Sequence, residues 1–67
     1  MDRLYKKIEL VGISSKSFED AVSSAIEKAS KTLHGLAWFE VVEQHGRIVD
    51  NKITEFQAVI RVAFKLD

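Results

Sequence analysis

Apolar and polar residues alternate near the start of the chain, where Ile8 and Leu10 are separated by Lys7 and Glu9. A period of two predicts a β-strand with one apolar face, and we place this strand at residues 5–14. Gly12 and the serines after it are expected to end the strand.

The next segment has the pattern of an amphipathic helix. Its apolar residues recur at helical spacing on one stripe: Phe18, Ala21, Val22, Ala25, Ile26, Ala29 and Leu33. Ser17 is expected to cap the start of the helix, with Asp20 three residues later in a variant of the capping box. Gly35 is expected to end the helix in a left-handed conformation.

Two further strands are predicted. The first covers about residues 37–45, with Gly46 as a bulge or bend, and residues 50–52 then form a turn. The second covers about residues 53–66 and has an unbroken alternating apolar set: Phe56, Ala58, Ile60, Val62, Phe64 and Leu66. Because this last strand is the longest and most apolar, we place it in the centre of the sheet. Residues 1–67 are thus predicted to form one α+β domain, β-α-β-β, whose three antiparallel strands have the order 1-3-2 and partly wrap one helix.

One helix covers only one side of such a sheet, and the uncovered side carries the only tryptophan of the chain. Trp38 and Phe39 are adjacent and point to opposite sides of the predicted strand. Phe39 continues the apolar set with Val41, so Trp38 is expected on the uncovered side. Gln57, on the neighbouring strand, is expected on the same side. Two interpretations remain open at this point: Trp38 is an anchor in a subunit interface, or it stacks on a flat heteroaromatic ligand whose edge Gln57 recognises.

Composition narrows the class of protein. The chain has 67 residues, ten basic and ten acidic side chains, and no cysteine. A chain this short has a small core, and without disulfides we expect it to be stabilised by self-association. The charge balance and the short apolar runs argue against a nucleic-acid partner and a membrane span, and we expect a cytoplasmic protein. His34 and His45 lack a metal-ligand motif, and no serine is spaced to form a nucleophile with either one, so neither a metal site nor an enzyme is predicted.

The ordered set of segments resembles the dodecins, a family of small flavin-binding proteins. The resemblance covers nearly the whole chain through YKKIELVG (residues 5–12), SFEDAV (17–22), ASKTL (29–33), WFEVVE (38–43) and FQ (56–57). It implies a hollow homododecamer that binds flavins in pairs between subunits related by two-fold axes. In the family, each flavin pair lies between two symmetry-related tryptophans, which match Trp38, and a glutamine that matches Gln57 hydrogen-bonds the pyrimidine edge.

The resemblance also implies a role and further candidate residues. It implies storage and buffering of FMN or riboflavin and protection from light, because an indole in contact with an excited flavin can quench it. Many members have an arginine near the flavin where this chain has His45, although strict alternation places His45 opposite to Trp38 unless Gly46 bends the strand. Some members also hold coenzyme A through basic residues, for which Arg3, Lys6 and Lys65 are the candidates here. The alternative function is a structural cage, or a coenzyme A-binding assembly, with no physiological role in flavin binding.

Overall fold

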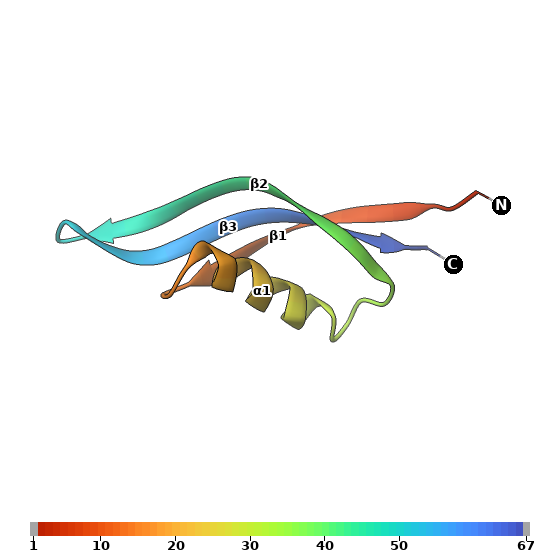
Figure 1. Ribbon diagram of the computed structural model, residues 1–67, viewed down its shortest axis with the longest axis horizontal. Coiled ribbons are helices and arrows are strands. Elements are labelled where there is room, and N and C mark those ends of the chain that lie inside the picture. Colours follow the sequence, from red (N-terminus) through yellow and green to blue (C-terminus); the bar gives the residue numbers. More distant parts are fainter. Residues whose placement is uncertain (1, 67) are drawn as a thin grey trace.

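The computed structural model describes residues 2–66 as a three-stranded antiparallel sheet with one helix on one side (Figure 1). The elements are β1 (Tyr5–Ser14), α1 (Phe18–Ala29), β2 (Leu36–Val49) and β3 (Lys52–Lys65). β3 is central and antiparallel to both neighbours, which confirms the predicted order 1-3-2. β2 is longer than predicted, because it continues through Gly46 to Val49.

The helix begins where the sequence predicts and ends earlier. The Ser17 hydroxyl accepts a hydrogen bond from the Asp20 backbone N–H at 2.9 Å. The Asp20 carboxylate does not complete a capping box with Ser17, because it accepts a hydrogen bond from the Ser14 hydroxyl at 2.6 Å. The predicted end at Gly35 is wrong: α1 ends at Ala29, and turns follow it in which the Leu33 N–H donates to the Ala29 carbonyl. Gly35 does take a left-handed φ of 73°, but within the loop that leads into β2.

Gly12 lies inside β1 and does not end it. It stands where α1 crosses the strand. A Cβ atom at Gly12 would lie 2.2 Å from the carbonyl oxygen of Ala21 and 3.1 Å from the Cβ of Ala25. The helix backbone therefore approaches the sheet as closely as the small residues on its buried stripe allow. The close contact explains why glycine and alanine stand here instead of larger apolar residues.

The core lies between α1 and the central strand. Ala21, Ala58, Ile60 and Val62 are buried there, and partly buried side chains of β1, α1 and β2 pack around them. α1 packs mainly against β1 and β3, so the helix-facing side of β2 is open. Phe39 and Val41 on that side are 48% and 44% exposed. Phe39 lines an open groove with the helix residues Val22 and Ile26.

β2 and β3 form a hairpin that projects beyond the end of β1 (Figure 1). Asp50 and Asn51 connect the two strands with φ angles of 53° and 63°, as a two-residue turn of type I′ requires. The projecting part carries Ile48 and Ile53, which are paired across the hairpin and are 69% and 64% exposed. Within residues 2–66, the structure has no helix with the length and apolar character that crossing a bilayer requires.

Candidate functional site

The side of the sheet away from α1, called the outer face here, carries the predicted site residues. Directly paired residues on antiparallel strands point to the same face, so the strand register defines its membership. The outer face consists of Tyr5, Lys7, Glu9, Val11 and Ile13 on β1, Trp38, Glu40, Glu43, His45 and Arg47 on β2, and Glu55, Gln57, Val59, Arg61, Ala63 and Lys65 on β3.

An aromatic pair occupies one end of the outer face. Trp38 on β2 lies against Tyr5 on β1, with ring centroids 4.9 Å apart and planes inclined by 58°. Between the two strands lies Ala63 of β3, which has no exposed surface although no helix covers this face. Trp38 is 46% exposed, so much of the indole is available to a partner outside the chain. The Arg3 guanidinium lies 6.0 Å from the centroid of the Tyr5 ring, within range of a cation–π interaction.

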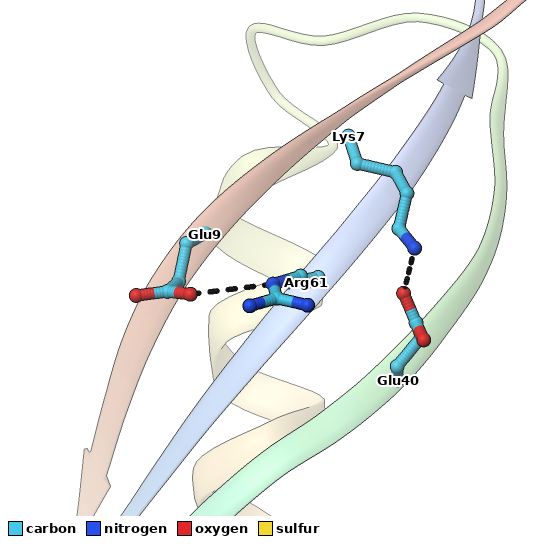
Figure 2. Close-up of polar contacts among 4 residues, drawn as sticks. All are labelled: Lys7, Glu9, Glu40 and Arg61. Carbon is cyan, nitrogen blue, oxygen red and sulfur yellow. Dashed lines mark hydrogen bonds and ion pairs between the residues drawn. The ribbon is translucent and has the colours of Figure 1, made fainter.

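Two ion pairs occupy the middle of the outer face (Figure 2). Lys7 of β1 bonds Glu40 of β2 across the central strand, and the Arg61 Nε lies 3.4 Å from a carboxylate oxygen of Glu9. The hydrogen bond from Lys7 lowers the pKa of the Glu40 carboxyl below its usual 4.5 and outweighs the opposing effect of desolvation, and the positive charges of Lys7 and Arg61 lower the pKa further. The middle of the face is thus charged but electrically balanced.

Polar side chains occupy the other end. The carboxamide nitrogen of Gln57 donates to Glu55 at 3.2 Å, and His45 lies directly opposite Gln57 in the strand register. The Nδ1 atom of His45 is 3.2 Å from a carboxylate oxygen of Glu43. Gln57 is half-buried, and its carbonyl oxygen and amide group offer both an acceptor and donors to a ligand.

A β-bulge places His45 on this face, which corrects the expectation from strict alternation. Val41 pairs with Ile60 and Glu43 pairs with Val59, so Val42 is an extra residue in β2. An extra residue reverses which side chains point outward along the rest of the strand. His45 therefore joins Trp38 and Gln57 on the outer face, whereas Gln44, paired with Ala58, points to the helix side. The predicted bend at Gly46 is not the cause, because Gly46 pairs in regular register with Phe56.

The two principal site residues share a face but lie far apart along it. Trp38 pairs with Ala63, and Gln57 lies six residues earlier on the same central strand. At ~3.3 Å per residue, these levels of the sheet are separated by about 20 Å. That separation exceeds the length of a fused three-ring ligand. A flat ligand of that size therefore cannot lie against the backbone positions of both residues on one chain.

The basic residues suggested for coenzyme A do not gather on one face. Lys65 pairs with Tyr5, and Lys6 pairs with Phe64, so Lys65 points to the outer face and Lys6 to the helix side. Arg3 lies over Tyr5 near the outer face. The described residues also contain no cluster of three histidine or acidic side chains that could hold a metal ion.

Comparison with known proteins shows the family. The dodecin family model matches residues 4–67. Dodecin from Thermus thermophilus is 45% identical over 67 residues, which cover all of this chain and 97% of the relative. The structure of dodecin from Streptomyces davaonensis superimposes with a TM-score of 0.95 at 39% identity, over 100% of this chain and 98% of that one. The chain belongs to the dodecin family.

The name of a more distant relative refers to a ligand. Calcium dodecin from Mycobacterium tuberculosis, described as having a novel calcium-binding site, superimposes with a TM-score of 0.83 at 28% identity. The alignment covers 96% of this chain and 91% of that one. The name of that relative refers to calcium alone, so the ligand of this chain has to be argued from its own side chains.

Two features of the site were not predicted from the sequence. The contact of Tyr5 with Trp38 joins β1 to β2 across the central strand, and it depends on the relative register of all three strands. The bulge at Val42 has no sequence signal, because Val42 is an ordinary strand residue with no glycine beside it. A β-bulge without glycine is recognised from the pairing of two strands. The alternation of residues along one strand does not contain that information.

Proposed function

We propose that the protein binds flavin, as FMN or riboflavin, between the outer faces of two subunits and stores it in a form protected from light. One observation carries the proposal: the half-exposed indole of Trp38 and the carboxamide of Gln57 lie on one face, about 20 Å apart. Two outer faces related by a two-fold axis bring the Trp38 of one chain toward the Gln57 of the other. Each ring then meets an aromatic plane and a group that matches its alternating carbonyl and N–H edge.

The residues of the outer face suit binding and quenching better than catalysis. The Trp38 indole can donate an electron to an excited flavin in van der Waals contact and recover it, so that the excitation is lost without a product. A redox enzyme needs open space for a substrate against the flavin ring. Rings stacked on both faces leave no such space, and we therefore propose a binding protein, not an enzyme.

The proposed assembly is the homododecamer that the family resemblance implies. It is supported by the amount of apolar surface that one chain leaves uncovered, which includes Val11, Phe39, Val41, Ile48 and Ile53. Apolar patches of this kind are rare on stable monomers and mark interfaces. They lie on both sides of the sheet, so a chain contacts neighbours through more than the outer face.

Titration of flavin-free protein into FMN and into riboflavin tests the function. Flavin emission is expected to fall as the complex forms, and Trp38→Ala is expected to abolish the fall while the assembly persists in size-exclusion chromatography. Trp38→Phe serves as the matched variant, because it keeps an aromatic ring and loses the indole donor. Undiminished flavin emission in protein excess would overturn the proposal.

A structural cage is the second candidate function, and the exposed apolar surface favours it as well. In that case Trp38 anchors a subunit interface, and Trp38→Ala breaks the assembly instead of only the flavin complex. The same chromatography separates the two functions. Absorption of the protein as purified adds an independent test, because a storage protein is expected to carry a yellow flavin that chromatography can identify after release.

A further inference from the structure

Tyr5 and Trp38 lie side by side on the outer face. The two aromatic rings come from the two edge strands and meet across β3, at a centroid distance of 4.9 Å and an inclination of 58°. This distance and tilt lie in the range in which aromatic pairs attract each other. The complete burial of Ala63, on a face that no helix covers, shows that side chains of the neighbouring strands close over the central strand here.

The contact limits the freedom of a side chain that otherwise stands on an open sheet. An indole at an edge strand turns about two side-chain torsions, and ordering such a group on binding reduces affinity. The Tyr5 ring has a second neighbour in the Arg3 guanidinium, which lies over it at 6.0 Å from the centroid. The result is an indole that contacts the Tyr5 ring on a residue that is still 46% exposed.

We propose that Tyr5 is a positioning residue that fixes the plane of Trp38 before the ligand binds, so that one face of the indole is presented for stacking. This inference rests on the proposed function for the identity of the ligand. The orientation of Trp38 itself belongs to the ligand-free protein and can be measured without flavin. Tyr5 need not touch the ligand in order to act in this way.

The test uses the fact that Trp38 is the only tryptophan of the chain. Time-resolved fluorescence anisotropy of the flavin-free assembly, excited at the red edge of the indole band, reports the local motion of Trp38 alone. Tyr5→Leu is expected to add a fast depolarisation and to weaken binding of riboflavin by about 2- to 10-fold. Tyr5→Phe, which keeps the ring, is expected to match the unmodified protein in both measurements. Tyr5→Thr, a substitution suited to a strand, is measured in parallel so that the result does not depend on one variant folding.

Leu4→Ala is the control for a lost apolar side chain near the same strand, because Leu4 is 66% exposed and precedes Tyr5. Size-exclusion chromatography of each variant shows that the assembly is retained. The proposal is overturned if Trp38 stays immobile in Tyr5→Leu and Tyr5→Thr, or if Trp38 becomes mobile while the affinity is unchanged. A failure of the unmodified protein to bind riboflavin would instead overturn the proposed function, and the anisotropy of the flavin-free protein would still decide whether Tyr5 holds Trp38.

Discussion

At the scale of single residues, the pKa of Glu40 depends on the charged side chains around it in the middle of the outer face. Its hydrogen bond from Lys7 lowers its pKa below the usual 4.5. A carboxyl whose pKa is lowered by folding stabilises the fold above its unfolded pKa, and this stabilisation is lost as the pH falls through the folded pKa. We expect Lys7→Met to move the Glu40 pKa back up toward 4.5, as measured by carboxyl carbon NMR during an acid titration.

Lys6→Met is the matched control for this change, because Lys6 is the adjacent lysine and points to the other face of the sheet. It removes the same charge without removing the hydrogen bond, so the Glu40 titration should barely move. Equal shifts in the two variants would show that general charge, and not the direct contact drawn in Figure 2, sets the pKa of Glu40.

Gln57 provides the second prediction at this scale, which depends on the proposed function. Leucine is similar in size to glutamine but offers no hydrogen bond, so Gln57→Leu should leave the polar edge of a bound flavin unsatisfied. Losing such a partner costs about 1–3 kcal/mol, and we expect the riboflavin dissociation constant to rise roughly 5- to 150-fold.

The control for Gln57→Leu is Gln44→Leu, which makes the same chemical change on the helix side of β2. Isothermal titration of both variants with riboflavin distinguishes them. If Gln44→Leu weakens binding as strongly as Gln57→Leu, or if neither weakens it, Gln57 does not recognise the ring edge.

At the scale of secondary-structure elements, Gly12 sets the distance between α1 and β1. A methyl group at this position would lie 2.2 Å from the Ala21 carbonyl oxygen, which belongs to helix backbone and cannot rotate away. We expect Gly12→Ala to lower the free energy of unfolding by about 1–3 kcal/mol, as overpacking of a core does. Urea unfolding followed by circular dichroism measures the loss. Ser24→Ala is the comparison, since Ser24 is exposed on α1 and lies away from the contact with β1. A smaller effect at Gly12 than at Ser24 would contradict the close contact.

The elements differ in how far the sequence alone defines them. The bounds of β1 and the start of α1 were predicted from alternation and from the Ser17 cap, and both are confirmed. The predicted end of α1 was wrong, because Leu33 continues the apolar stripe although the chain has already turned at Ser30. Local patterns record which side of a segment is apolar, but they do not record where tertiary contacts stop supporting it.

The site shows the same limit. Trp38 and Gln57 were placed on one face correctly, since alternation suffices for each strand separately. The position of His45 depended on the Val42 bulge, and the distance between Trp38 and Gln57 depended on the register of β2 against β3. Both are properties of strand pairing, so the sequence predicted the two principal site residues but not how far apart they lie on one chain.

At the scale of the whole molecule, the chain is a thin plate with a small interior. Its extents are 54 × 20 × 13 Å, and five apolar residues are buried among those the structure describes: Ala21, Ala58, Ile60, Val62 and Ala63. Small chains without disulfides or metal ions gain stability by oligomerisation. The exposed side of β2 next to α1, with Phe39 at its centre, is the apolar surface that a neighbouring subunit would cover.

We therefore expect Phe39→Asp to prevent assembly, because it would bury an unpaired carboxylate in an apolar interface. Light scattering coupled to size-exclusion chromatography should show a species far below the mass of twelve 7.6 kDa chains, with a lower thermal midpoint. Ser24→Asp adds the same charge to an exposed position of α1 and should leave the mass unchanged. Phe39 lies on the opposite side of β2 from Trp38, so loss of assembly in Phe39→Asp would also remove flavin quenching without touching the indole. Quenching that survives in a monomeric Phe39→Asp protein would show that the flavin site needs only one chain, which the separation of Trp38 from Gln57 argues against.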